Sequence, residues 1–177
     1  QGCSGYEFYE MGFKTDAISV ARETAEALNQ VCDASSGKSI VLTLDPSDNW
    51  ALTSLYPQWG VERTFDAMDF STYIHSLLKT GSLNLGHANI EIAYHDPCHL
   101  GRVQRVFSQP REILTSIEGL SLKEMHWNGQ QAHCCGGHLK FIDPVLAGKI
   151  AHERVNQIKE TGVRHVVTAC PKCCDSF

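Results

Sequence analysis

Two long stretches of the chain place hydrophobic residues at the spacing of a helix. Between residues 14 and 34, apolar side chains return every three or four positions, and charged residues stand between them. This pattern predicts an amphipathic helix over 14–34. A second stretch begins with Pro144 and ends before Gly162, and it predicts a helix over 144–161. Weaker patterns predict shorter helices at 50–55, 64–78 and 110–118.

Short apolar runs between these helices predict strands. The run at 39–44 is rich in β-branched residues and is expected to be buried, and further strands are expected at 89–94, 120–127 and 164–169. Strands that alternate with helices are typical of an α/β fold with a mainly parallel sheet. Ligands of such sheets bind at the carboxyl ends of the strands, so we expect a ligand site there.

Composition and charge exclude several classes of protein. Hydrophobic residues make up 42% of the chain and charged residues 20%, which is typical of a globular rather than a disordered protein. Fifteen basic and 20 acidic residues give a net charge of −5, which disfavours nucleic acid as a partner. No apolar run approaches the roughly 18 residues of a membrane span. Because the chain begins with Gln1 rather than Met, we expect the native N-terminus to be missing.

Eight cysteines and nine histidines are more than an ordinary core requires. An even number of cysteines can form disulfides, but six of the eight lie between Cys98 and Cys174, and none lies between 33 and 97. The adjacent pair Cys134-Cys135 and the run 170–174 favour ligation of a metal or an iron–sulfur cluster in a reducing compartment.

The clustered cysteines follow predicted strands. Cys98 comes after the strand at 89–94, and Cys170 comes after the strand at 164–169. Cys134 and Cys135 follow the strand at 120–127 through a loop. Because the carboxyl ends of parallel strands meet at one edge of a sheet, we expect these cysteines to converge.

An internal repeat is suggested by two similar stretches. Gly2-Cys3-Ser4-Gly5 precedes a long helix, a strand and Asp45-Pro46-Ser47-Asp48, while Cys134-Cys135-Gly136-Gly137 precedes a long helix, a strand and Cys170-Pro171-Lys172-Cys173. We expect a degenerate first half at 1–85, which lacks its beginning, and a complete half at 86–177. Carboxylates are hard ligands that suit iron–sulfur clusters poorly, so no cluster is expected in the first half.

The spacing of the cysteines in the second half resembles a known family. Cys98, Cys134-Cys135-Gly136 and Cys170-x-x-Cys173, with the flanking run 94–102, resemble the cysteine-rich CCG domain. That domain occurs in one of the subunits of heterodisulfide reductases and in the iron–sulfur subunits of glycolate oxidase, lactate-utilisation and anaerobic glycerol-3-phosphate dehydrogenase systems. The resemblance is strong over 90–177 and weak over 1–60. It implies two pseudo-repeated, Rossmann-like halves.

The resemblance also implies a cofactor. In the family, a complete motif can hold a [4Fe–4S] cluster of non-cubane type through five cysteines, which here are Cys98, Cys134, Cys135, Cys170 and Cys173. Thiolates are soft, anionic ligands that suit iron and sulfide. Gly136 and Gly137 are expected to let the backbone approach the cluster and to offer N–H donors to its sulfurs.

Residues around the five cysteines are open to more than one interpretation. His99 and His133 are expected to donate hydrogen bonds to the cluster or to carry protons near it, or else to bond to the backbone as ordinary loop histidines. Arg102 either holds an anionic substrate, offsets the charge of the cluster, or is solvated. We expect Cys174 to be a packed thiol, Cys3 to be a relic of the repeat and Cys32 to be a structural thiol.

The resemblance implies a redox function. We expect an iron–sulfur module that passes electrons between a flavin-dependent 2-hydroxyacid oxidase, or a related dehydrogenase, and an electron carrier or quinone. It would be a subunit or domain of an oxidoreductase, with flavoprotein and ferredoxin-type iron–sulfur partners. It would lie in the cytoplasm, free or held at the membrane face by a partner.

Two alternative functions remain open. The first is disulfide reduction of the heterodisulfide-reductase type at the cluster. The second is a structural zinc-binding interaction domain, for which the adjacent Cys134 and Cys135 are awkward ligands of one tetrahedral ion.

Overall fold

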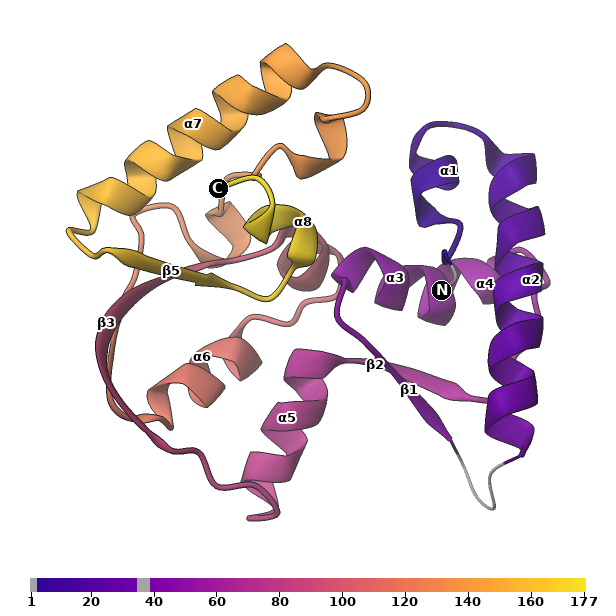
Figure 1. Cartoon of the computed structure of the whole chain (residues 1–177), viewed down its shortest axis with the longest axis horizontal. Coiled ribbons are helices and arrows are strands. Elements are labelled where there is room, and N and C mark those ends of the chain that lie inside the picture. The colour runs from indigo at the N-terminus through magenta and orange to yellow at the C-terminus, as the bar shows by residue number, and fades with distance from the viewer. Residues whose placement is uncertain (1–2, 35–38) are drawn as a thin grey trace. The chain divides into compact units, whose positions relative to one another are not determined.

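The computed structural model describes residues 3–34 and 39–177, so Gly2 of the predicted repeat lies outside the described residues. The chain is a mixed α/β protein with small parallel sheets (Figure 1). It divides into two compact units, unit 1 at 1–70 and unit 2 at 71–177. Within the described ranges, no helix is both long and apolar enough to cross a bilayer.

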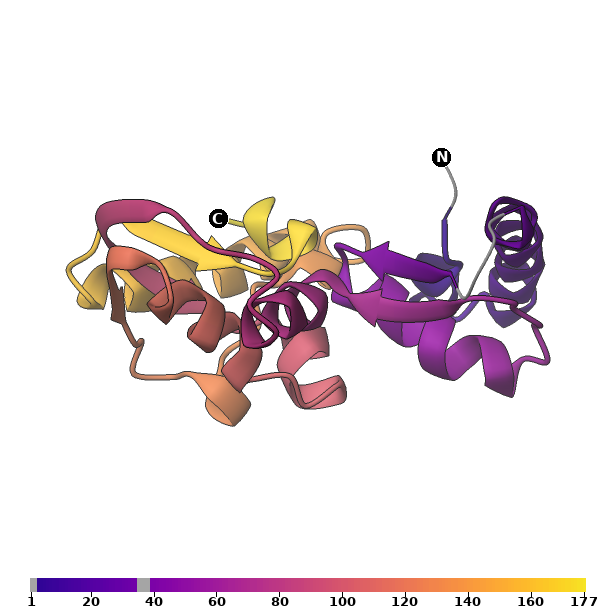
Figure 2. The same ribbon diagram turned by 90° about the horizontal axis from the view of Figure 1, so that it is seen from below.

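Unit 1 is built around a long helix and a two-stranded parallel sheet, whose strands run side by side in Figure 2. Ala21 and Ala25 of the long helix pack with Leu52, Leu55 and Tyr56 in its core. The helix predicted at 14–34 is confirmed, and small alanines let it pack closely. The elements are α1 (Tyr6–Glu10), α2 (Lys14–Asp33), β1 (Ile40–Thr43), α3 (Pro46–Trp50), the π-helical turn η1 (Ala51–Leu55), α4 (Tyr56–Gln58) and β2 (Asp66–Asp69).

Two predictions for unit 1 need correction. The helix predicted at 64–78 is wrong in its first part, because 66–69 forms β2 and pairs in parallel with β1. Pairing with a neighbouring strand outweighs the weak helical spacing of this segment. The strand predicted at 39–44 is confirmed as β1, but it is not buried: Ile40 and Leu42 are 47% and 38% exposed.

Unit 2 holds a three-stranded parallel sheet in the order β4-β3-β5, and Figure 1 labels the neighbouring strands β3 and β5. Its elements are α5 (Phe70–Lys79, whose first residue is the last of unit 1), β3 (His87–His95), the π-helical turn η2 (His99–Val103), α6 (Ser108–Thr115), β4 (Glu118–Lys123), the 3-10 turns η3 (Gly129–Gln131) and η4 (Gly137–Leu139), α7 (Pro144–Glu160), β5 (His165–Thr168) and α8 (Pro171–Cys174).

Most predicted elements of unit 2 are confirmed. The strands at 89–94 and 164–169 and the helix at 144–161 lie within two residues of β3, β5 and α7. The strand predicted at 120–127 starts earlier, at Glu118, and stops at Lys123, and the helix predicted at 110–118 is α6 at Ser108–Thr115.

The short helix predicted in unit 1 at 50–55 extends over Pro46–Gln58 as α3, η1 and α4. It begins earlier than predicted since Asp45 caps its first turn by accepting from the Ser47 N–H at 2.8 Å.

The central strand positions two of the cysteines. His95, the last residue of β3, stands opposite Thr168, the last residue of β5. The chain reaches Cys98 three residues after β3 and Cys170 two residues after β5. Since β3 and β5 are parallel neighbours, both cysteines leave the sheet at the same edge.

Candidate functional site

Five cysteines form one continuous group at this edge of the unit 2 sheet. The thiols lie within hydrogen-bonding range of one another in the order Cys98, Cys134, Cys135, Cys173 and Cys170. Three of them, Cys135, Cys170 and Cys173, are buried, and the other two are half-buried. These are the five residues that the CCG-like spacing singles out. We call them the cysteine group.

The start of α8 positions two members of the group. Cys170 has an extended backbone and precedes Pro171, which begins the helix, and the Cys174 N–H donates to the Cys170 carbonyl at 3.1 Å. Cys173 is then carried back toward the sheet edge by one helical turn. Cys135, Cys170 and Cys173 pack together against Phe177.

A glycine turn positions Cys134 and Cys135, which are adjacent in the sequence. Gly136 has φ +80°, a left-handed conformation that glycine adopts without strain. The Gly136 N–H donates to Cys134 Sγ at 3.3 Å, and the Gly137 N–H donates to Cys135 Sγ at 3.4 Å. A Cβ at Gly136 would lie 2.7 Å from the carbonyl oxygen of Ala147, so the turn sits directly against α7.

A buried ion pair holds the loop that carries Cys98. Asp96 is 3% exposed, and its carboxylate accepts from Arg111 Nη1 at 2.7 Å and Nη2 at 2.8 Å. The same carboxylate accepts from the Gly129 N–H at 2.8 Å. Asp96 therefore ties the end of β3 to α6 and to the turn η3. The hydrogen bond with Asp96 raises the pKa of Arg111 well above its usual range.

Proton sharing among the thiols shifts their pKa values in opposite directions. The pKa of Cys134 is far below its usual range because this sulfur accepts from Cys135 and Cys98. The pKa values of Cys98, Cys135 and Cys173 are raised by hydrogen bonding to neighbouring sulfurs, and burial adds to the effect. A metal bound there would have to displace the protons that the raised pKa values keep on Cys98, Cys135 and Cys173.

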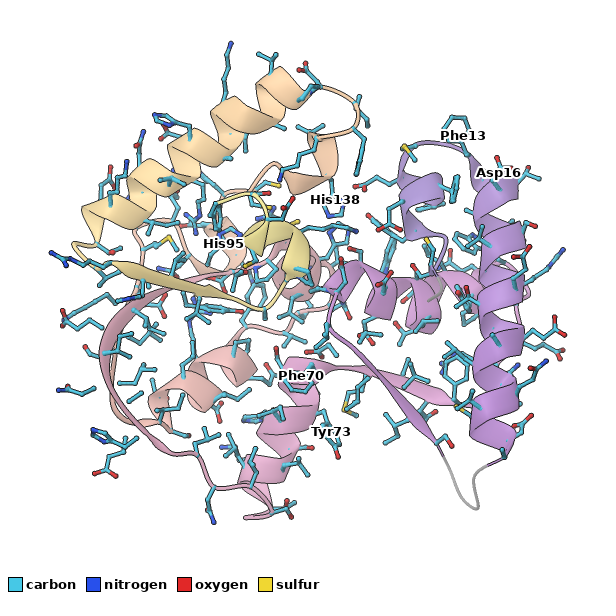
Figure 3. The ribbon with its side chains drawn as sticks, viewed as in Figure 1. Phe13, Asp16, Phe70, Tyr73, His95 and His138 are labelled. Carbon is cyan, nitrogen blue, oxygen red and sulfur yellow. The ribbon has the colours of Figure 1, made fainter. Side chains whose placement is uncertain are left out.

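His95 lies beside the cysteine group, and its imidazole ring has a single protonation state. One of its ring nitrogens and the sulfurs of Cys135 and Cys173 lie within 4.8 Å of one another, and Figure 3 shows its side chain next to α8. Arg154 Nε donates to His95 Nδ1 at 3.0 Å. Burial and the Arg154 charge lower the pKa of His95 to about 3, so the ring is neutral. Because Nδ1 accepts, the single proton is on Nε2, which is buried and has no hydrogen-bond partner among the described residues.

Arg154 is a buried residue close to the cysteine group that the sequence reasoning missed. Its side chain is fully buried and donates to three uncharged acceptors: His95 Nδ1, the Trp127 carbonyl at 2.9 Å and Gln157 Oε1 at 2.6 Å. Burial lowers the pKa of Arg154. A signal for it exists in the sequence, since Arg154 follows Ala147 by seven residues on the buried face of α7.

The predicted histidines lie at different places around the group. His99 Nδ1 is 3.5 Å from Cys98 Sγ, and its ring lies 4.8 Å from that of His138, which Figure 3 labels. Cys98, His99 and His138 form a second set of potential metal ligands within 4.8 Å. His133 stacks on Trp127 at 5.2 Å, and its Nδ1 lies 2.8 Å from Gln157 Nε2.

The three remaining cysteines are separate from the line of five thiols. Cys174 is exposed on α8, so the prediction of a packed thiol is wrong. Cys32 packs at the edge of the unit 1 core, as expected for a structural thiol. Cys3 is exposed, and its thiol donates to Glu7 Oε2 at 3.3 Å.

Comparison with known proteins places this site in a family context. Residues 92–177 match the family described as CCG, a cysteine-rich domain. This segment includes all five members of the cysteine group.

Curated relatives include several redox proteins. One subunit of the fumarate reductase (CoM/CoB) of Methanothermobacter marburgensis is 34% identical over 139 residues, covering 77% of this chain and 27% of the relative. An iron–sulfur protein of Methanocaldococcus jannaschii is 31% identical over 175 residues, covering 98% and 32%. One subunit of the dihydromethanophenazine:CoB–CoM heterodisulfide reductase of Methanosarcina barkeri is 34% identical over 117 residues, covering 64% and 29%. The chain thus spans about a third or less of the length of these relatives.

Proposed function

Because residues 92–177 belong to the CCG family of cysteine-rich domains, we propose that the cysteine group holds an iron–sulfur cluster and that the chain is an electron-transferring part of an oxidoreductase. The single observation that carries this proposal is the line of five neighbouring thiols in unit 2. A cluster of this kind supplies one-electron transfer when it is bound.

The donor set fits iron and sulfide better than a single metal ion. Five soft sulfurs exceed the four ligands of a tetrahedral zinc site, and the adjacent Cys134 and Cys135 suit a unit with several irons. His95 is not offered as a ligand, since Nδ1 is occupied by Arg154 and Nε2 carries the proton. We therefore propose a [4Fe–4S] cluster of non-cubane type with Cys98, Cys134, Cys135, Cys170 and Cys173 as ligands, at the carboxyl ends of β3 and β5.

Several groups of unit 2 are suited to stabilise thiolates. The Gly136 and Gly137 N–H groups already donate to the sulfurs of the adjacent pair. Arg154 is a buried cation whose hydrogen-bond acceptors are all uncharged, so nearby anionic sulfurs would lower the cost of burying it. His99, beside Cys98, and His133 are proposed to donate hydrogen bonds near the cluster.

We further infer that unit 1 is a degenerate copy of the cluster-bearing half. Gly5 and Gly136 have φ +83° and +80°, and a Cβ at either would strike the carbonyl oxygen of an alanine in the following long helix. The Gly5 N–H donates to Cys3 Sγ at 3.4 Å, as the Gly136 N–H does to Cys134.

Polar residues take the places of further cysteines in unit 1. Asp45 precedes the proline that begins α3, as Cys170 precedes the one that begins α8. Ser4 Oγ donates to Asp48 Oδ1 at 2.5 Å. In unit 2 the residue that corresponds to Ser4 is Cys135, and the residue that corresponds to Asp48 is Cys173. This internal hydrogen bond satisfies both groups without iron, so we propose one cluster per chain, in the half that spans 86–177.

The names of the relatives support a place in a larger redox enzyme. They are subunits of reductases or iron–sulfur proteins. We propose that this chain passes electrons between a flavoprotein that oxidises a 2-hydroxy acid and a carrier or quinone, with ferredoxin-type partners. Clustered free thiols suit a reducing compartment, so we place it in the cytoplasm, free or held at the membrane face by a partner.

Anaerobic purification tests the proposal. The protein should bind iron and acid-labile sulfide in equal amounts and give an EPR signal in one redox state. A protein that takes up zinc instead, without visible absorbance, would favour the structural alternative. Two-electron reduction of a disulfide substrate by the loaded protein, with reduced methyl viologen supplied as the electron donor, would favour the heterodisulfide-reductase type of chemistry.

A further inference from the structure

The imidazole of His95 carries a buried N–H that lacks an acceptor among the described residues. His95 is the last residue of β3, where parallel pairing with Thr168 of β5 fixes its backbone, and its side chain is not exposed to solvent. Since Nδ1 accepts from Arg154, the proton of the ring is on Nε2. A buried N–H without an acceptor is costly, so this donor is suited to an acceptor that is bound at the site.

Two buried sulfurs of the cysteine group lie at this ring. A ring nitrogen of His95 and the sulfurs of Cys135 and Cys173 lie within 4.8 Å of one another, and Figure 3 shows the His95 side chain next to α8. Because Arg154 already bonds to Nδ1, Nε2 is the nitrogen that has a hydrogen bond to give. Sulfur that is bound to iron, as thiolate or as sulfide, is anionic and accepts an N–H more strongly than a neutral thiol does.

Phe177 makes the surroundings of this donor apolar. Its ring meets the ring of His95 edge to face, with 4.9 Å between the centroids. The same side chain packs on the buried thiols of Cys135, Cys170 and Cys173. In surroundings of low dielectric constant, a hydrogen bond to an anionic sulfur is electrostatically stronger than it is in water.

Arg154 holds the imidazole in the orientation that presents this donor. A guanidinium group has no acceptor, so its contact with His95 Nδ1 at 3.0 Å can form in one direction only. Arg154 is itself held in place, since Nη1 donates to the Trp127 carbonyl at 2.9 Å and to Gln157 Oε1 at 2.6 Å. A cationic donor at Nδ1 also polarises the ring and strengthens the N–H at Nε2.

We propose that His95 Nε2 donates a hydrogen bond to an iron-bound sulfur at Cys135 and Cys173 and thereby raises the one-electron reduction potential of the cluster, with Arg154 as the residue that positions the imidazole. Reduction adds one negative charge, so a hydrogen-bond donor stabilises the reduced form more than the oxidised form. One electron enters from the reductant, and the imidazole keeps its proton. The inference rests on the proposed function and adds to it a residue that sets the potential.

The test is a redox titration of the anaerobically reconstituted chain at fixed pH, with dithionite as the reductant and EPR as the readout. His95→Met removes the donor and keeps a side chain of similar size. It should lower the equilibrium constant for one-electron reduction about tenfold, as expected for the loss of one charge-assisted hydrogen bond, which is about 59 mV. His95→Gln has both an oxygen that can accept from Arg154 and an N–H that can donate to sulfur, so it should keep most of the wild-type potential.

Two further variants separate the orientation of the ring from charge and from packing. Arg154→Lys keeps the positive charge but not the directed contact with His95, so the potential should fall in the same direction as in His95→Met. This variant also carries the test if His95→Met does not take up iron. Met125→Leu is the control, because it changes a buried side chain of the unit 2 core at nearly constant volume and should titrate like wild type.

The measured potentials and the iron content decide different claims. A fully loaded His95→Met or Arg154→Lys protein with the wild-type potential would overturn the inference and leave the proposed function in place. A His95→Gln protein that loses as much potential as His95→Met would also overturn it, since packing rather than the donor would then be responsible. A wild-type chain that binds no iron would instead overturn the proposed function, and this inference with it.

Discussion

Arg154 Nε donates a hydrogen bond to His95 Nδ1 across 3.0 Å, and neither side chain is exposed to solvent. The contact joins residues 59 positions apart. It fixes which ring nitrogen of His95 bears the proton, since the arginine can only donate. The N–H of His95 at Nε2 can therefore donate to an acceptor beside Cys135 and Cys173.

This relationship predicts the tautomer of His95. Nitrogen-15 NMR of the reduced, iron-free protein at neutral pH should show Nε2 protonated and Nδ1 unprotonated. Arg154→Lys should lose this selection, because the shorter ammonium cannot make the same directed contact. A proton on Nδ1 in the wild-type protein would contradict the assignment and reopen His95 as a metal ligand.

The glycine turn predicts a strong effect of a single methyl group. Gly136→Ala should lower the free energy of unfolding by at least about 2 kcal/mol, from the left-handed φ and the clash with Ala147. Gly148→Ala is the matched control, since a Cβ there meets open space on α7 and should stabilise the helix by about 0.5–1 kcal/mol. Urea unfolding measures both variants, and equal stabilities would refute the role of the turn.

Arg111 has two acidic partners, and we expect the loss of the buried one to lower the free energy of unfolding more than the loss of the exposed one. Asp96→Asn should cost roughly 3 kcal/mol, because it leaves Arg111 without its buried carboxylate. Glu124→Gln removes the partly exposed partner of the same arginine and should cost at most about 1 kcal/mol. Similar losses for the two variants in urea unfolding would show that burial of Asp96 does not matter.

The contact between α5 and α6 predicts that the stability of the folded state depends on pH. Hydrogen bonds from Lys79 and then His75 lower the pKa of Glu112 to about 2, from an ordinary value near 4.5. A lowered carboxyl pKa stabilises the folded state above pH 4.5, and this contribution is lost as the pH falls toward 2. The stability difference between wild type and Glu112→Gln should therefore shrink between pH 6 and pH 2. A difference that stays constant would contradict the shift, and Glu160→Gln on the exposed end of α7 should match wild type throughout.

The meeting of the cysteines could be foreseen, because their positions follow strands whose pattern is clear. The apolar runs before Cys98 and Cys170 form the neighbouring strands β3 and β5, and parallel pairing brings their carboxyl ends together. β2 was missed because four residues carry too little periodicity to show which strand they will pair with.

The network beyond the cysteines could not be derived from local pattern. Arg154 lies within an amphipathic helix, and only its place on the buried face distinguishes it from a solvated arginine. Its pairing with His95 depends on the packing of α7 against the end of β3, which periodicity does not specify. The same holds for Asp96 and Arg111, whose contact joins a strand end to a helix.

Iron and acid-labile sulfide per chain, measured after anaerobic reconstitution of a set of cysteine variants, test the central claim most directly. Wild type, Cys174→Ser and Cys32→Ser should each bind about four iron and four sulfide. Serine at any of the five clustered positions, Cys98, Cys134, Cys135, Cys170 or Cys173, should lower both contents sharply. Full iron content in any of those five variants, or a wild-type protein that binds no iron, would contradict the claim that the cysteine group holds the cluster.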